Sequence, residues 1–209
     1  QEPLAFGTRP DDDRWTAFVA GTRMAFISVQ ADEAEYYTKI ESKQEQTKLA
    51  QGLPNVGDSS KSNKREAETV ARLIHTLCQL YSRSGIPFSP CKQIGIIVPF
   101  RAQIAMIRKA LAERHIPDTA DITIDTVERY QGSQRDIIIF STTVSRPYQL
   151  SILSEPVMTD GREIDRKLNV ALTRARKQFF MTGNETLLRN CTAYRKFLDF
   201  LSKEQILRL

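Results

Sequence analysis

Two arginines, Arg174 and Arg176, are of the residue type that can neutralise charge on a transferring phosphoryl group. They end the stretch 166–176, which reads RKLNVALTRAR. Its apolar residues recur at helical spacing and predict one apolar stripe: Leu168, Ala171, Leu172 and Ala175. On such a helix the two arginines would lie about 160° apart, so we expect them to have separate roles. The same pattern is typical of a surface helix with solvated or salt-bridged arginines, and this stretch alone leaves both interpretations open.

A second stretch, 126–136, reads TVERYQGSQRD and leads directly into the apolar run 137–141. Gln131 and Gly132 stand in the turn before that run, where a glycine permits a tight turn or the close approach of a ligand. Gln131 and Gln134 offer amide donors and acceptors suited to a nucleotide or a water. A generic loop-to-strand turn has the same composition, so this pattern is again open to two interpretations.

Short apolar runs and amphipathic stretches alternate along the chain and predict the elements that position these residues. Asn63 is expected to cap a helix, with Glu66 three residues on as in a capping box, and Gly85 and Pro87 are expected to stop it. Further helices are expected after Pro99, over the stretch that ends at Arg176, and at the end of the chain. Strands are predicted at 24–29, 94–98, 121–126, 135–144 and 177–182, with a polar loop over 145–164 and a closing helix over about 192–207.

This alternation predicts an α/β fold with a mainly parallel sheet and helices on both faces. Such sheets bind ligands at the carboxyl ends of their strands, where we expect the site. We treat residues 1–209 as one domain with a polar insertion at 31–62, which ends in SSKSNK after several glycines and a proline.

The charge of the chain is unevenly distributed. Residues 1–62 carry 7 Lys/Arg against 10 Asp/Glu, a net charge of −3, whereas residues 63–209 carry 23 against 15, a net charge of +8. A basic region of this kind is compatible with a nucleic acid or a nucleotide as partner, although many basic domains simply have solvated faces. No apolar run is long enough to span a membrane, and no signal peptide is visible at the start.

Several other kinds of site are disfavoured. The three cysteines and two histidines lack metal-ligand spacing, so no metal site is predicted, and free thiols indicate the cytoplasm, or the nucleus in a eukaryote. No glycine precedes Lys-Ser or Lys-Thr, so the sequence has no P-loop. The pair Asp32-Glu33 therefore has no phosphate cradle to serve, and we interpret it as part of a solvated acidic run. His75 is expected on the apolar side of its helix, as a core residue rather than a catalytic one.

Together these stretches resemble the superfamily 1 helicases, in the branch of the nonsense-mediated-decay and Okazaki-fragment helicases. Stretch 166–176 matches the family pattern R-R-L-N-V-A-L-T-R-A-R at nearly every position, and 126–136 resembles T-V-D-x-x-Q-G-x-E-x-D. Residues 94–103, IGIIVPFRAQ, resemble the family's G-I-I-T-P-Y-x-x-Q segment, and 63–70 resemble its N-x-x-E-A-x-x-V helix start. The resemblance covers roughly residues 63–190, with the matches in the family's order.

The resemblance implies a RecA-like second motor domain that works with ATP and Mg²⁺, held mainly by an N-terminal motor domain of the same parent chain. Arg174 would be the arginine finger, the catalytic residue that reaches the γ-phosphate. The nucleotide-binding residues implied on this side are Gln131, Gly132, Gln134 and Arg176. Contacts to a single strand of DNA or RNA are implied for Val98, Pro99, Phe100 and Thr126.

Three of the departures from the family pattern bear on the expected function. Gln134 replaces the usual Glu and removes a charge, Glu128 stands where Asp is usual, and Val98 replaces a frequent Thr. We therefore keep two alternatives to a working motor domain. One is a nucleic-acid-binding module with a decayed ATPase, and the other is a free-standing α/β protein that shares only the sheet.

Overall fold

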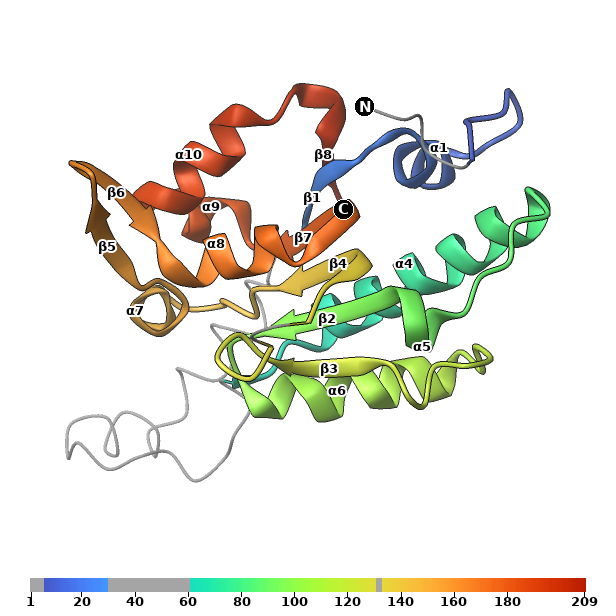
Figure 1. Cartoon of the computed structure of the whole chain (residues 1–209), viewed down its shortest axis with the longest axis horizontal. Helices are drawn as coiled ribbons and strands as arrows, with labels where there is room; N and C mark the ends of the chain where they lie inside the picture. The colour runs from blue at the N-terminus through green and yellow to red at the C-terminus, as the bar shows by residue number, and fades with distance from the viewer. Residues whose placement is uncertain (1–5, 30–60, 131–132) are drawn as a thin grey trace, which may run out of the picture.

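Six parallel strands form the centre of the molecule in the computed structural model, which describes residues 6–29, 61–130 and 133–209 (Figure 1). The strand order is β3-β2-β4-β7-β1-β8, so the chain crosses over the sheet repeatedly. All five strand pairs of this sheet are parallel, which confirms the predicted α/β class. The strands are β1 Met24–Ser28, β2 Ile94–Val98, β3 Thr123–Thr126, β4 Arg135–Ser141, β7 Ala175–Gly183 and β8 Ile206–Arg208.

Helices cover both faces of the sheet, as predicted. One core cluster lies beneath α1 (Arg14–Gly21), α4 (Lys64–Arg83) and α6 (Arg101–Glu113). The other lies beneath α8 (Arg166–Thr173), α9 (Glu185–Leu188) and α10 (Thr192–Phe200). The remaining elements are short: α5 Pro90–Gln93, η2 Pro147–Gln149, α7 Leu150–Leu153, η3 Lys203–Gln205, and the antiparallel hairpin β5 Pro156–Thr159 with β6 Arg162–Asp165.

Strand β4 shows why the central strands are apolar on both faces. Because successive side chains of a strand point to opposite faces, Ile137 and Ile139 enter one core cluster while Ile138 and Phe140 enter the other. All four side chains are fully buried. The continuous apolar run in the sequence is therefore the signature of a strand covered by two layers of helices.

The helix α4 begins as the sequence predicts, but its capping box is only half formed. The Asn63 side chain accepts a hydrogen bond from the Glu66 backbone N–H at 3.0 Å, so the cap is confirmed. The Asn63 backbone N–H, however, donates to Gln103 Oε1 at 2.7 Å rather than to Glu66. Gly85, with φ of 66°, follows the helix end and adopts the left-handed conformation that glycine tolerates.

Four sequence-based expectations are wrong: the burial of His75, the loop at 145–164, the end of the strand 135–144 and the extent of the closing helix. His75 is exposed on α4, so its placement in the core was wrong. The segment 145–164 is not a simple loop, because it contains η2, α7, β5 and most of β6. Strand β4 ends at Ser141, and the closing helix ends at Phe200 and is followed by η3 and β8. Most of the predicted insertion at 31–62, including Asp32-Glu33, lies outside the described residues.

Candidate functional site

The predicted site residues lie at two opposite edges of the sheet. In a parallel sheet all strands begin at one edge, which we call the amino edge, and end at the other, the carboxyl edge. Gln134 and Arg174 directly precede β4 and β7, and Arg176 is the second residue of β7, so all three lie at the amino edge. The expectation that they lie at the carboxyl ends of the strands was therefore wrong. Gln131 and Gly132 lie outside the described residues.

The junction between α8 and β7 separates the two predicted arginines. The helix ends at Thr173, and Arg174 is its C-cap, with a backbone N–H that reaches Ala171 O at 3.3 Å. The backbone N–H of Arg135 donates to Arg174 O at 3.0 Å, which draws the chain into the sheet at this point. Arg176 therefore lies on a strand, so the prediction of one helix carrying both arginines was wrong.

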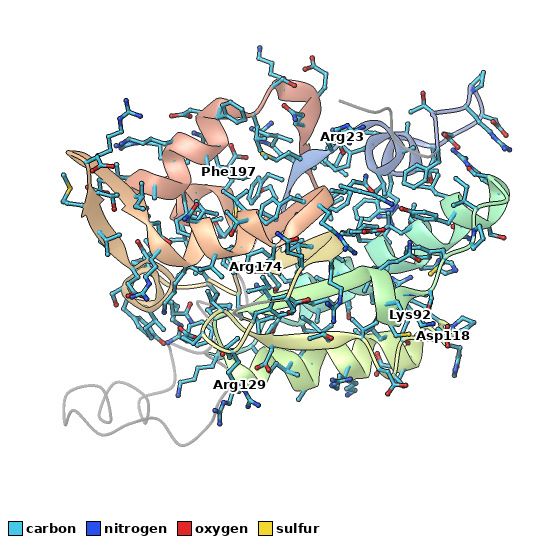
Figure 2. All side chains as sticks on the ribbon, viewed as in Figure 1. Arg23, Lys92, Asp118, Arg129, Arg174 and Phe197 are labelled. Atoms are coloured by element: carbon cyan, nitrogen blue, oxygen red, sulfur yellow. The ribbon has the colours of Figure 1, made fainter. Side chains whose placement is uncertain are left out.

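Arg174, labelled in Figure 2, is half-buried and carries a polar atom without a partner among the described residues. Its Nε is buried, and no described residue accepts a hydrogen bond from it. The side chain of Gln134 reaches the same junction, where its Nε2 donates to Thr173 O at 3.3 Å. The structure thus brings Gln134 and Arg174 together, one at the start of β4 and the other at the end of α8.

Arg176 has a different environment, because its guanidinium is engaged by Asp136. Arg176 Nη2 lies 2.8 Å from Asp136 Oδ1, and Lys177 Nζ lies 2.9 Å from the other carboxylate oxygen. Burial of Asp136 raises its pKa, but the hydrogen bond from Lys177, with smaller effects of Gln93 and of the Lys177 and Arg176 charges, outweighs burial and lowers the pKa. Two cations therefore share one ionised carboxylate at the amino edge.

Sequence reasoning missed Arg135, which completes this edge. Its Nη2 donates to Thr123 Oγ1 at 3.2 Å and its Nη1 to Gln134 O at 3.0 Å. Its Nε is buried and, like that of Arg174, has no hydrogen-bond partner among the described residues. The available signal was its position directly after Gln134 in the motif, which the family pattern leaves unspecified.

The predicted nucleic-acid residues lie at the carboxyl edge, but most of their side chains are buried. Val98 is fully buried, Phe100 is 6% exposed and Thr126 is 8% exposed, so a strand could meet little more than their backbone. Pro99 is partly exposed. The exposed cations beside them are Arg101, at the start of α6, and Arg129, whose side chain is 64% exposed and pairs with Asp125 at 3.4 Å. In Figure 2, Arg129 lies well apart from Arg174.

A buried carboxylate, Glu66, lies beneath the carboxyl edge. Its Oε2 accepts hydrogen bonds from Ser141 Oγ at 2.8 Å, Thr143 N at 3.1 Å and Thr182 Oγ1 at 3.0 Å. These donors follow or end strands β4 and β7, so one side chain of α4 ties the two strands together. Gln103 extends the network, because its Nε2 donates to Ser141 Oγ at 3.3 Å.

The Glu66 carboxyl is fully buried, and burial raises its pKa from 4.5 to about 7 against the opposing effect of its hydrogen bonds. Thr143 has a φ of 61°, a conformation that a β-branched residue rarely adopts. Its backbone N–H is one of the donors to Glu66, so the carboxylate helps to hold this strained residue in place.

Two kinds of feature are absent from the described residues. In residues 6–29, 61–130 and 133–209, no group of three or more His, Cys, Asp or Glu side chains is placed to hold a metal ion. No helix in these same segments is both long and apolar enough to cross a membrane.

Comparison with known proteins places these features in a family context. A family model described as "AAA domain" matches residues 13–186. The "Putative helicase MOV-10" of Gallus gallus is 32% identical over 155 residues, which cover 68% of this chain and 15% of that protein. The "DNA polymerase alpha-associated DNA helicase A" of Saccharomyces cerevisiae is 34% identical over 103 residues, or 49% of this chain and 14% of that protein.

A third relative is the "DNA replication ATP-dependent helicase/nuclease DNA2" of Bos taurus, 31% identical over 139 residues, which cover 66% of this chain and 12% of that protein. The chain thus spans only a small part, 12–15%, of each of these relatives. The matched family region, 13–186, contains both edges described above, including Arg174, Gln134 and Glu66.

Proposed function

We infer the function from one premise: this chain belongs to the AAA domain family, as the C-terminal RecA-like part of a superfamily 1 helicase. On that premise we propose that Arg174 is the arginine finger of an ATP-dependent DNA or RNA helicase. The observation that carries this proposal is the buried Nε of Arg174, which has no acceptor among the described residues. Buried polar groups of native proteins nearly always have a partner, so an orphaned guanidinium nitrogen indicates an acceptor that arrives with a ligand or a partner domain. An anionic phosphate supplies such acceptors.

The surroundings of Arg174 suit a residue that serves a partner domain. Arg174 caps a helix and its carbonyl is held by the sheet, so its backbone is fixed while the guanidinium lies at the edge. Gln134, anchored to Thr173 O, adds an amide at the same place that can bind a ribose hydroxyl or a water. Arg176 has the different task of neutralising Asp136, together with Lys177.

At the opposite edge we propose that a single strand of nucleic acid runs past Pro99 and the backbone of Thr126. Arg101 and Arg129 are the exposed cations that would neutralise its phosphates, and they replace the buried Val98 and Phe100 side chains in that role. Exposed arginine is the usual partner of a phosphate backbone, whereas fully buried apolar side chains serve the fold.

The amino and carboxyl edges are the opposite ends of the same strands, so a movement at one edge is passed on to the other. ATP would bind between this amino edge and the domain that carries the P-loop, and closure would bring Arg174 to the γ-phosphate. Magnesium, when bound, would neutralise charge on the phosphates, and its ligands would come from that other domain. Closure would also move β4 and β7 as one body, and with them the carboxyl edge, so that the grip on the strand changes with the nucleotide state.

The test compares Arg174→Ala with Arg195→Ala in the parent protein, since Arg195 is an exposed arginine on α10 and is none of the site residues named above. We expect the first change to lower ATP turnover by about a thousandfold or more, because the charge on the transferring phosphoryl group loses its cation. Binding of a single-stranded oligonucleotide should stay unchanged in both variants. Undiminished turnover in Arg174→Ala would refute the finger assignment, and ATP hydrolysis by the isolated 209-residue chain would refute its dependence on a partner domain.

A second candidate function is a nucleic-acid-binding module whose ATPase has decayed, and Gln134 favours it. Gln134 stands where the family pattern has Glu, and Glu128, at the carboxyl edge, is paired with Lys167 at 3.1 Å rather than left for a ligand. The variant Gln134→Glu separates the two functions in an ATPase assay of the parent protein. Turnover that is measurable before the change supports a working motor, whereas turnover that emerges only in Gln134→Glu supports decay.

A further inference from the structure

The segment 147–153, which comprises η2 and α7, presents an aromatic ring to solvent beside the carboxyl edge. Tyr148 is 55% exposed and Ile152 is 41% exposed, although both are large and mostly apolar. Their neighbours point inward, since Leu153 is fully buried and Gln149 is 1% exposed. The segment therefore has a buried side that fixes it and an exposed side formed by Tyr148 and Ile152, which we call the α7 ridge.

Hydrogen bonds on the buried side of segment 147–153 hold the α7 ridge in place. Gln149 Oε1 accepts from the backbone N–H groups of Ser145 and Arg146, each at 2.8 Å. On the outer side, Ser151 Oγ donates to Tyr148 O at 2.8 Å. A ring presented by such a fixed turn loses little conformational freedom when it binds a partner, because its backbone is already ordered.

A lysine joins the α7 ridge to the loop that follows β3. Lys167 Nζ donates to Ile152 O at 2.8 Å and lies 3.1 Å from Glu128 Oε1. The Lys167 side chain is only 17% exposed, so it acts as a link rather than as a free surface charge. Glu128 is two residues from Thr126, and the ridge is therefore continuous with the carboxyl edge.

We propose that the α7 ridge extends the path of the single strand, with Tyr148 as a platform on which one base stacks. The inference rests on the proposed function, because it needs a strand at Pro99 and Thr126 that then crosses Lys167 to reach the ridge. Single-strand sites combine a charged track for the backbone with exposed aromatic rings for the bases. Among the described residues of the carboxyl edge itself no aromatic ring is exposed, since Phe100 is buried. Tyr148 supplies that ring.

Stacking on Tyr148 would be tolerant of sequence, because every base has a π-face. It would also be independent of salt, because stacking releases no counterions, in contrast to a phosphate contact of Arg129. These two properties separate the ridge from the carboxyl edge in a binding experiment.

The experiment measures fluorescence anisotropy of labelled oligothymidylate and oligouridylate with the 209-residue chain and its variants. Tyr148→Ala should weaken binding by about tenfold, whereas Tyr148→Phe, which keeps the ring, should bind like the unmodified chain. Phe200→Ala is the matched control, because Phe200 is an aromatic residue on α10 that is 75% exposed. The slope of affinity against salt should be unchanged in Tyr148→Ala and smaller by about one in Arg129→Ala.

Two results would overturn the inference while leaving the proposed function intact. One is that Arg129→Ala weakens binding and Tyr148→Ala does not; the other is that Tyr148→Ala and Phe200→Ala weaken it equally. If the α7 ridge binds a protein partner instead, Tyr148→Ala should alter ATP turnover of the parent protein and leave its affinity for the strand unchanged. That result would also overturn the inference. Absence of any strand binding by the unmodified chain would instead reject the nucleic-acid role itself. Thermal unfolding followed by circular dichroism verifies that each variant is folded.

Discussion

The two ends of strands β4 and β7 treat their buried polar groups in opposite ways. At the carboxyl edge, Glu66 receives three hydrogen bonds from groups at the ends of β4 and β7. At the amino edge of the same two strands, Arg135 and Arg174 each bury an Nε that no described residue accepts. A saturated network stabilises a fold, whereas orphaned donors cost stability and are retained where a ligand completes them. The comparison supports the proposal that the carboxyl ends of β4 and β7 hold the strands in place, whereas their amino ends present Arg174 to a nucleotide.

The strongest test of this comparison removes the acceptor at the carboxyl edge. Glu66→Leu would leave Ser141 Oγ, the Thr143 N–H and Thr182 Oγ1 without their common acceptor, each a buried donor. We expect a loss of about 4 kcal/mol in the free energy of unfolding, measured with urea, because unsatisfied buried groups cost roughly 1–3 kcal/mol each. Glu68→Leu, on the exposed side of the same helix, should change stability by less than about 0.5 kcal/mol. Equal effects of the two changes would contradict a structural role for the Glu66 network.

The pH dependence of the free energy of unfolding gives a second test of the Glu66 network. Burial raises the pKa of Glu66 from 4.5 to about 7, so the folded chain binds a proton between these values that the unfolded chain has released. Stability contributed by this group is therefore highest below pH 4.5, falls as the pH rises to about 7, and is constant above that. The fall amounts to roughly 3 kcal/mol, since one pKa unit corresponds to about 1.4 kcal/mol.

Glu66→Gln isolates this effect, because it keeps the shape of the side chain and removes the titration. The difference in unfolding free energy between the unmodified chain and Glu66→Gln should decline between pH 4.5 and 7. The partners that face Glu66 are uncharged, namely Asn63, Ser141, Thr143 and Thr182, so they add no titration of their own. A difference that is flat over this range would show that the carboxylate is ionised throughout.

The layered fold could be predicted well from the sequence, because the signals for it are local. The strand 94–98 and the helix that starts after Asn63 follow from apolar runs and caps within a few residues of each other. The end of α8 was not predictable in the same way. It depends on the hydrogen bond from Arg135 N to Arg174 O, between residues that lie far apart in the sequence. Helical periodicity therefore continued to Arg176 in the prediction, two residues into a strand.

In the candidate site, too, features set by neighbouring residues could be predicted, whereas features set by contacts distant in the sequence could not. The family motifs identified Arg174 and Gln134, and the structure brings the two residues to one junction. The hydrogen-bond partners of Glu66 could not be predicted from the sequence. Its local pattern indicates a capping box, whereas its actual partners, Ser141 and Thr182, come from two strands. His75 was misplaced because helical spacing alone could not tell which side of its helix would face solvent.

The smallest expected effect on stability belongs to Arg174→Ala and completes the comparison. Arg174 makes no side-chain hydrogen bond within the described residues that would be lost, and removing its Nε also removes an unsatisfied buried donor. We therefore expect a change within about 0.5 kcal/mol in the free energy of unfolding, measured with urea on the isolated chain. Arg83→Ala is the matched control, because its guanidinium pairs with Asp12 and donates to Gly7 O at 2.9 Å, and its loss should destabilise the chain measurably. If Arg174→Ala instead unfolds the chain as readily as Glu66→Leu does, Arg174 serves the fold, and its proposed role toward a nucleotide at the amino edge is refuted.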